Sequence, residues 1–457
     1  MEKFFKLKEH GTNVKTEIVA GITTFLAMAY ILAVNPSMLG STGMNSEGVF
    51  LATAISAAIA TIIMAFLANY PIALASGMGL NAYFAYTVCL SDEMAGVAEP
   101  WKVALTAILV EGIIFIILSA FKFRETLVNC IPANLKLGIT TGIGLFITFI
   151  GLQNAGIAAT EASTKVTLGD LGSPQVALAL IGVAIIGIML YFNVKGAILW
   201  GILVTWVLGI LAELGGWYVP NPEAGVYSVI PSIEGIHSFL PNFGAMGDVA
   251  FKFDFSWVAN NVIGFATIVF AFLFVDLFDT VGTLIGVAAK GNMLDKEGKL
   301  PRVGKALMAD AVGTVAGACL GTSTVTSYVE SSAGVAEGGR TGLTSLTTAV
   351  LFILAIFFWP IFGAIPSFAT APALIIVGMF MMSSVSKVKF EGDTADVLGA
   401  FVAIIMMPFT YSIANGIMFG VLTWMILKIV RGKVKEIHPV MWIVFALFVL
   451  RVITLVM

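Results

Sequence analysis

Long apolar stretches separated by short polar links run along almost the whole chain. A helix needs about 20 apolar residues to cross a bilayer. The pattern predicts membrane-spanning segments at 17–35, 48–68, 72–90, 101–121, 135–152, 174–192, 196–214, 260–288, 304–320, 324–338, 341–362, 370–387, 394–409 and 411–430. A Gly- and Pro-rich connection, 215–259, separates the first seven segments from the last seven. The remaining apolar run, 438–457, is either a fifteenth span or a helix lying on the membrane.

The composition supports this pattern and excludes several classes of protein. Of the 457 residues, 59% are hydrophobic and 11% are charged, whereas soluble domains carry roughly 25% charged residues. The chain therefore reads as an all-α polytopic protein of the cell membrane. Cys89, Cys130 and Cys319 are scattered, and the three histidines lie outside the long apolar runs. Neither a metal site nor a haem is expected, the ATP-binding pattern GxxxxGK[ST] is absent, and we expect no cofactor and no nucleic-acid partner.

The charge distribution predicts the orientation. If the N-terminus is cytoplasmic, 20 of the 24 basic residues fall in cytoplasmic segments, as the positive-inside rule requires. At this end, Glu337 and Arg340 are expected to form an ion pair. The exceptions to the rule are Lys102, Lys165, Lys252 and Arg451.

Two segments in matching positions look interrupted. The third, PIALASGMGLNAYFAYTV, and the tenth, GTSTVTSYVESSAGVAEGG, are too rich in Gly, Ser and Thr for continuous lipid-facing helices. Two halves of seven spans have opposite orientations, so they form an inverted repeat. Transporters built in this way bind substrate near the bilayer midplane, between discontinuous helices whose free N–H groups face a polar ligand. The sequence therefore predicts a midplane site between these two segments.

Acidic residues at membrane depth identify the candidate chemistry. Glu330 lies among small polar residues of the tenth segment, and Asp276 and Asp279 lie one helical turn apart in FVDLFDTVGTLIG. Ionisable groups in a membrane are costly, so they usually mark a transport path or a proton relay. Two further acids have less specific surroundings. For Glu111, an interhelical hydrogen bond is favoured over a proton role, and Asp310 is expected to be structural.

Four stretches resemble one known family. These are GITTFLAMAYILAVNP (21–36), SGMGLNAYFAYTV (76–88), FDTVGTLIG (278–286) and GTSTVTSYVESSAGVAEGGRTGLT (321–344). They are similar to the AzgA-like branch of nucleobase–cation symporters, which are purine permeases related in fold to the uracil permease. Ser76 departs from the branch, which has a proline there.

The resemblance implies an architecture of 14 spans arranged as a 7+7 inverted repeat. Segments 1–4 and 8–11 would form a core domain, at 1–134 and 260–362. Segments 5–7 and 12–14 would form a gate domain, at 135–259 and 363–457. The third and tenth segments would each carry a short extended stretch, and the two stretches would pair near the midplane.

The resemblance also assigns roles to individual residues. Glu330 would bind the base, and Asp279 would contribute to binding and to proton coupling. Asp276 would take part in coupling or support Asp279 from behind. Asn81 and Gly79 would form the third-segment part of the site, although Asn81 could equally cap the following half-helix. The substrate-binding set is completed by Ser327 and Tyr328, and Tyr328, Tyr83 or Phe84 could pack on the ring faces.

The resulting prediction is a proton-coupled importer of guanine, hypoxanthine or adenine that works by alternating access. The resemblance favours protons over sodium and a homodimer in the lipid bilayer. The alternatives are an anion, ascorbate, uracil or xanthine carrier on the same fold, or an intramembrane enzyme. An aspartyl protease is disfavoured because Asp276 and Asp279 lie on one helix and the GxGD signature is absent.

Overall fold

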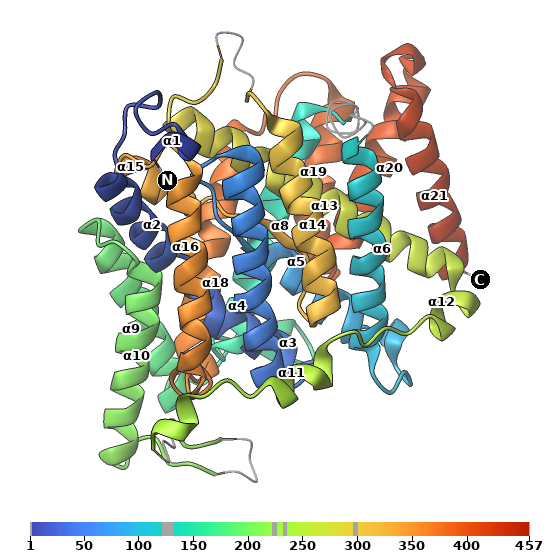
Figure 1. The fold of residues 1–457 in the computed structure, drawn as a ribbon. Helices are drawn as coiled ribbons and strands as arrows, with labels where there is room; N and C mark the ends of the chain where they lie inside the picture. Colours follow the sequence, from blue (N-terminus) through green and yellow to red (C-terminus); the bar gives the residue numbers. More distant parts are fainter. Residues whose placement is uncertain (1, 121–130, 222–225, 232–234, 296–299, 457) are drawn as a thin grey trace.

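The protein is a bundle of mostly upright helices (Figure 1). The computed structural model describes residues 2–120, 131–221, 226–231, 235–295 and 300–456. The long helices are α2 (Val14–Met28), α3 (Ile31–Gly40), α4 (Ser46–Ile63), α6 (Pro100–Ala120), α8 (Ala133–Asn154), α9 (Pro174–Tyr191), α10 (Ala197–Leu214), α13 (Val262–Lys290), α14 (Val303–Leu320), α16 (Gly342–Ala355), α18 (Ser367–Met382), α19 (Thr394–Phe409), α20 (Ile413–Val430) and α21 (Pro439–Val456).

Shorter elements connect these helices or interrupt them. The short α-helices are α1 (Glu2–Phe5), α5 (Met78–Ala82), α11 (Phe243–Val249), α12 (Ser256–Asn260), α15 (Ser331–Ala336) and α17 (Trp359–Phe362). The π- and 3₁₀-helices are η1 (Met64–Ala68), η2 (Tyr83–Cys89), η3 (Asp92–Met94), η5 (Ile236–Phe239), η6 (Ile356–Phe358), η7 (Ser383–Lys387) and η8 (Val434–Glu436). The strands are β1 (Leu74–Ser76), β2 (Ala158–Glu161), β3 (Lys165–Leu168) and β4 (Val325–Ser327).

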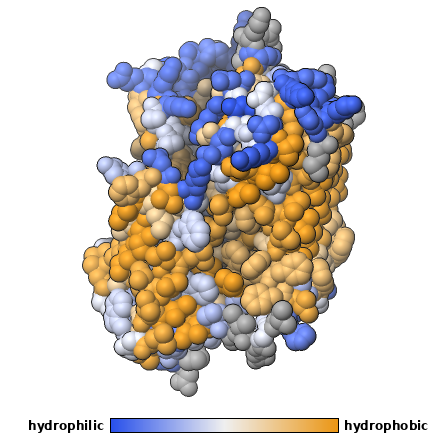
Figure 2. Space-filling model, turned by 60° about the vertical axis from the view of Figure 1, so that its left-hand side comes forward, coloured by the Kyte–Doolittle hydropathy of each residue, from blue (hydrophilic) through white to orange (hydrophobic). Residues whose placement is uncertain are grey.

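Most of the predicted apolar segments are long helices. Within the described residues, 11 helices are long and apolar enough to cross a membrane, and α19 is a shorter apolar helix. The flank of the molecule is largely apolar, whereas hydrophilic residues gather at one end (Figure 2). The first apolar segment is longer than predicted, because α2 and α3 together extend from Val14 to Gly40 with a bend between Met28 and Ile31.

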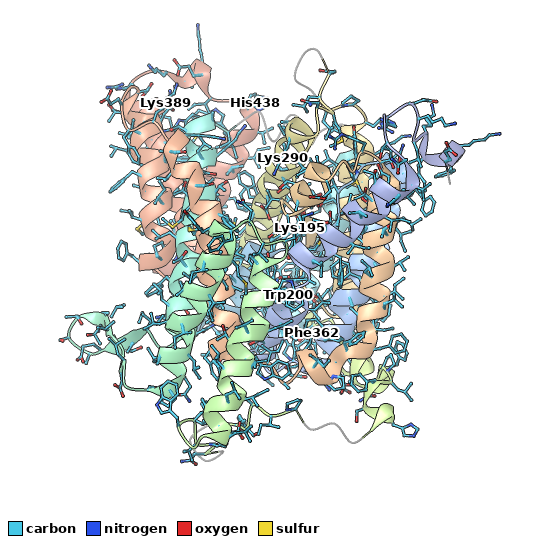
Figure 3. The ribbon with its side chains drawn as sticks, turned by 90° about the vertical axis from the view of Figure 1, so that its left-hand side faces the viewer. Lys195, Trp200, Lys290, Phe362, Lys389 and His438 are labelled. Carbon is cyan, nitrogen blue, oxygen red and sulfur yellow. The ribbon has the colours of Figure 1, made fainter. Side chains whose placement is uncertain are left out.

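The hydrophilic end is also the basic end. Lys290, Lys389 and His438 lie at this end of the molecule, and Phe362 lies toward the other end (Figure 3). Lys122, Arg124, Lys296 and Lys299, which are also predicted here, lie outside the described residues, as does Cys130.

The third and tenth segments are interrupted where the sequence predicts. Strands β1 and β4 pair antiparallel, with Leu74 opposite Ser327 and Ser76 opposite Val325. β1 leads into α5 and η2, and β4 leads into α15. Gly321, whose φ is +98°, ends α14 in the left-handed region and directs the chain toward β4. The backbone hydrogen bonds of both strands are thus satisfied inside the protein rather than toward lipid.

The helices pack in two groups. In one, α4 contacts α14 and α16, α6 contacts α13 and α14, and α2 contacts α15 and α16. In the other, α8 contacts α18 and α19, α9 contacts α10 and α18, and α19 contacts α20. Fewer contacts join the groups, among them those of α5 with α8 and of α13 with α20. The pair of interrupted segments belongs to the first group and faces the second.

Helix α21 runs down the side of the bundle (Figure 1) and packs on α13 and α20. The rings of Phe448 and Phe270 meet edge to face with centroids 5.3 Å apart. At the basic end, the α20 lysine Lys428 is held by Asp393 at 3.0 Å and by Glu436 at 2.8 Å. This ion cluster ties the beginning of α19 and the η8 turn to the end of α20.

Candidate functional site

The interrupted segments hold each other beyond the two paired strands. The N–H of Gly77 donates to the carbonyl of Thr324 at 3.0 Å, and the N–H of Tyr328 donates to the carbonyl of Ala73 at 3.0 Å. The hydroxyl of Tyr328 donates to the carbonyl of Ser76. Helix α5 then begins at Met78. The N–H groups of its first turn have no intrahelical partners, and no side chain caps them. The predicted pairing of two extended stretches is present, and a half-helix follows each of them.

A narrow cavity of about 50 Å³ lies where the two segments face the second helix group. It is lined by Tyr30, Gly77, Met78, Gly79, Asp279, Thr283, Ser327, Tyr328, Val329, Glu330, Val377 and Met381. Val377 and Met381 come from α18, and the other residues come from the first group. Helix α18 thus closes the cavity on the side of the second helix group.

Two carboxyl groups face this cavity from different elements. Glu330 lies between β4 and α15, directly before the first residue of α15. Its Oε1 accepts a hydrogen bond from the Tyr30 hydroxyl at 2.7 Å. Asp279 comes from the middle of α13. Tyr30 stands at the bend between α2 and α3, which turns its hydroxyl toward Glu330. A carboxylate accepts several hydrogen bonds, so the Glu330 carboxylate keeps acceptor capacity for a ligand.

Ser327 and Tyr328 complete the polar lining. The Ser327 Oγ is buried and has no hydrogen-bond partner among the described residues. Unsatisfied buried hydroxyls are costly, so this one is suited to a ligand or to water. The Tyr328 ring is also buried and lines the cavity.

Asn81 lies behind the cavity. Its Oδ1 accepts hydrogen bonds from the Ser76 Oγ at 2.7 Å and from the Ser323 Oγ. Asn81 thus ties its own segment to the tenth one. Ser76 supplies one of the two hydroxyls. Tyr83 is also directed elsewhere, since its ring packs edge to face on Phe272 with centroids 4.6 Å apart.

Asp276 also lies outside the cavity lining. The Thr280 hydroxyl is 3.2 Å from the Asp276 Oδ1, 2.8 Å from the Asp310 Oδ1 and 2.6 Å from the Thr326 Oγ1. Because Thr326 belongs to β4, the two aspartates support this strand from the side away from the cavity. Asp310 is buried, as expected of a structural acid.

Glu111 makes a buried hydrogen bond, but its partner lies outside the helices, so this contact is not the interhelical bond that was favoured. Its Oε2 accepts a hydrogen bond from the Thr324 hydroxyl at 2.8 Å, which joins α6 to the residue before β4. The predicted ion pair between Glu337 and Arg340 is wrong. Glu337 instead pairs at 2.7 Å with Lys195, and Arg340 donates to backbone carbonyls that include Val335 at 2.7 Å.

Several lining residues were not predicted. Tyr30 belongs to the GITTFLAMAYILAVNP stretch, so its motif was visible although its role was not. Thr283 lies one helical turn beyond Asp279 on α13, and this i+4 spacing could have identified it. Val377 and Met381 carry no sequence signal, because apolar residues of a second helix group reach the cavity only through tertiary packing.

Residues 15–419 match the Permease family. The chain belongs to this family. It is therefore a multi-pass membrane transport protein.

Named relatives of this permease cover nearly the whole chain. The guanine/hypoxanthine permease PbuO of Bacillus subtilis is 46% identical over 97% of this chain and 98% of its own length. The guanine/hypoxanthine permease PbuG of Bacillus subtilis is 43% identical over the full length of both chains. The adenine permease AdeP of Escherichia coli is 41% identical over 99% of this chain and 96% of its own length.

The fold is found in solved transporters with little sequence similarity. The transmembrane domain of the cyanobacterial bicarbonate transporter BicA matches with a TM-score of 0.63 and 18% identity, over 88% of this chain and 97% of that domain. SLC26A9 matches with a TM-score of 0.63 and 12% identity, over 92% of this chain and 66% of its own length. At these identities, the likeness shows a shared fold.

Proposed function

We propose that this permease is a secondary-active, proton-coupled importer of purine bases. The observation that carries the proposal is the placing of two carboxyl groups, from Asp279 and Glu330, on one cavity between two interrupted segments. The relatives named guanine/hypoxanthine and adenine permeases support the substrate class. The described residues that line this cavity include two carboxyl groups and no cationic side chain, which favours a neutral base over an anion.

The lining suits the edges and faces of a purine. A purine carries N–H donors beside carbonyl or ring-nitrogen acceptors. The Glu330 carboxylate accepts from two neighbouring N–H groups, and such charge-assisted bonds are strong. The Ser327 hydroxyl and the N–H groups at the start of α5 donate hydrogen bonds to the carbonyl or ring-nitrogen acceptors of the base. The rings of Tyr30 and Tyr328 provide apolar surface against the base.

Proton coupling requires a carboxyl group that changes its protonation state during the cycle. Burial disfavours the charged form of a carboxyl group, and hydrogen bonds or opening to water favour it. Asp279 and Glu330 face one cavity, so closing or opening this cavity changes the surroundings of both. We assign the proton to Asp279 and the direct base contact to Glu330. Asp276 takes a supporting part, since it holds Thr280 beside β4.

The proposal includes the architecture that alternating access needs. The first helix group, at 1–134 and 260–362, is the core domain, and the second, at 135–259 and 363–457, is the gate domain. The 14 segments form a 7+7 inverted repeat with the N-terminus in the cytoplasm, and the permease is a homodimer. The separate packing of the two groups and the basic residues at one end support this arrangement.

Uptake into proteoliposomes tests the function. Labelled hypoxanthine is offered under an inward proton gradient, with adenine, guanine, xanthine, uracil and bicarbonate as competitors. The proposal predicts accumulation that purines block and that a protonophore collapses. Gradient-independent flux without accumulation would contradict secondary active transport. Competition by uracil or bicarbonate, but not by purines, would contradict the substrate class.

A further inference from the structure

A second cavity shares two lining elements with the central one, the third segment and α13. It has a volume of about 440 Å³ and is lined in part by Tyr86, Thr87, Glu93, Tyr411, Asn415 and Arg451. The third segment carries both cavities, since α5 supplies Met78 and Gly79 to the central one and η2 supplies Tyr86 and Thr87 to the second.

Helix α13 also joins the two cavities. Thr267 lines the second cavity and Asp279 lines the central one. A helix rises 1.5 Å per residue, so these positions are about 18 Å apart along its axis. Since α13 runs from Thr267 to Asp279 and on to Lys290 at the basic end, the second cavity lies between the central site and the opposite end of the molecule.

The walls of the second cavity are aromatic. The rings of Tyr86 and Tyr411 stand edge to face with centroids 6.2 Å apart. Asn154 fixes the Tyr86 ring by donating to its hydroxyl at 2.9 Å. Tyr411 has a φ of +53°, which is uncommon for a bulky residue. The fold holds this ring at the cavity despite the local cost in backbone energy.

Polar groups lie beside these rings. The Thr87 Oγ1 is buried and has no hydrogen-bond partner among the described residues, although it belongs to the cavity lining. The Asn415 side chain adds a donor and an acceptor at the start of α20. A buried unsatisfied hydroxyl beside aromatic rings fits a flat solute that has hydrogen-bonding groups on its edge.

The charges of the cavity disfavour an anion. Arg451 of α21 donates to the Glu93 Oε1 at 3.0 Å and to the Glu93 Oε2, so these two charges cancel. Asp92 also belongs to the lining and leaves an excess of negative charge. The ion pair fastens α21, which begins after residue 419 where the family match ends, to the loop that follows η2.

We infer that the second cavity is a separate binding site for a purine base, occupied on the way to the central site. The inference rests on the proposed function. The base stacks against Tyr86 or Tyr411 and bonds to Thr87 and Asn415, and the pair of Glu93 with Arg451 closes the side of the cavity. Because the contacts assigned to the base here are uncharged, binding is weaker than at the Glu330 carboxylate.

Protection of an introduced cysteine tests the site in detergent-purified protein. Ser91→Cys, which lines the cavity and has no assigned contact with the base, is made in a cysteine-free background that retains uptake, and its reaction with a maleimide is timed with and without hypoxanthine. The measurement is repeated with Glu330→Gln, which removes the central contact. Hypoxanthine is added at about three times its dissociation constant for the second cavity. Occupancy of the cavity then slows the maleimide reaction about fourfold, both with Glu330 present and with Glu330→Gln.

Three controls make the result specific. Leu90→Cys lines the same cavity and serves if Ser91→Cys does not fold. Ser163→Cys lies exposed in the turn between β2 and β3 and should react at the same rate with and without base. Thr87→Val, which keeps the side-chain shape, should raise the concentration of hypoxanthine needed for protection.

The outcomes separate the inference from the proposed function. Protection with Glu330→Gln supports a second site. Protection that disappears with Glu330→Gln, or no protection while the parent protein still transports hypoxanthine, overturns the second site and leaves the proposed function intact. A parent protein that neither binds nor transports any purine overturns both.

Discussion

The third and tenth segments have the same outline and different chemistry. Each enters the protein as a three-residue strand and continues as a half-helix, and the strands pair with each other. The tenth segment supplies Ser327, Tyr328 and Glu330 to the cavity, whereas the third supplies Gly77, Met78 and Gly79. The tenth segment contributes polar side chains that can bind a base. The third segment contributes mainly backbone, and its glycines let the two helix groups approach closely.

This difference predicts how the two segments respond to substitution. Changes in the tenth segment should alter affinity and leave the fold intact, because its side chains point at the cavity. Changes in the third should act through packing. A Cβ added to Gly79 would lie 2.9 Å from the Ile143 Cγ2 of α8, so this glycine permits a close approach between the two helix groups.

The largest effect is expected from Glu330→Gln. Replacing the carboxylate by an amide removes the charge from two hydrogen bonds to the base, at about 3 kcal/mol in total or about a 100-fold loss of affinity. Binding of hypoxanthine to purified protein measures the loss, and the thermal unfolding midpoint checks that the variant is folded. Unchanged affinity would contradict the difference drawn between the two segments, because the side chains of the tenth segment would then not bind the base.

Asp279→Asn should separate transport from coupling. The side chain keeps its shape but cannot release a proton, so we expect at least about a tenfold loss of accumulation driven by a proton gradient. Exchange of labelled for unlabelled base should persist, and uptake should no longer depend on external pH. Asp276 lies outside the cavity, so uptake by Asp276→Asn should keep more of its dependence on external pH than uptake by Asp279→Asn. A parental pH profile in Asp279→Asn would move the proton role elsewhere, with Glu111 next to be tested.

Gly79→Ala tests the third segment by shape alone. The added methyl group presses on Ile143, and overpacking of this kind costs about 1–3 kcal/mol, so uptake should fall about tenfold. Gly187→Ala is the matched control, because no atom lies within 4 Å of the Cβ that it would add to α9. If both substitutions leave uptake at the parental rate, close approach at Gly79 does not matter for the cycle.

Asn81→Ala should show that this residue acts on stability more than on affinity. It leaves the hydroxyls of Ser76 and Ser323 without their shared acceptor, at a cost of about 1–3 kcal/mol in the free energy of unfolding. The unfolding midpoint and hypoxanthine affinity are measured on the same sample. A large loss of affinity at an unchanged midpoint would make Asn81 a ligand contact in another state of the cycle.

The smallest effect on transport is expected far from both segments, at Asp393. Hydrogen bonds from the ammonium groups of Lys433 and Lys428 hold the pKa of Asp393 well below its usual range. A lowered folded-state pKa contributes stability above the unfolded-state value of about 3.9, and this contribution is lost as pH falls toward the folded-state pKa. Asp393→Asn should therefore lower the unfolding midpoint at neutral pH, and the difference from the parent should shrink in acid. Uptake should change little, and a difference that grows in acid would contradict this assignment.

The hydrophobic pattern predicted the helices well because membrane spans need long apolar runs with few charges. The interruption at 74–76 and 325–327 was also predictable, since Gly, Ser and Thr cluster there in an apolar context. Glu330 and Asp279 also stood out, because an acid within a membrane segment is rare. Their joint position on one cavity is as expected, and their roles remain predictions.

Other features are contacts between residues far apart in the chain, which the hydrophobic pattern of the sequence does not predict. Asn81 sits in a site motif, yet its carbonyl faces Ser323 of the other segment rather than the cavity. Glu337 has an arginine three residues away, but it pairs with Lys195 from another helix group. In the sequence, Tyr30 lies within an apolar run and has no polar signal of its own. Only the folded structure shows that its hydroxyl meets the Glu330 carboxylate.

The most direct test of the central claim is an experimental structure of the protein with hypoxanthine bound. The account predicts the base between the two interrupted segments, with ring N–H groups within hydrogen-bond distance of the Glu330 carboxylate and with Asp279 facing the same cavity. A base bound with full occupancy away from both carboxylates, and an empty cavity between the segments, would contradict it.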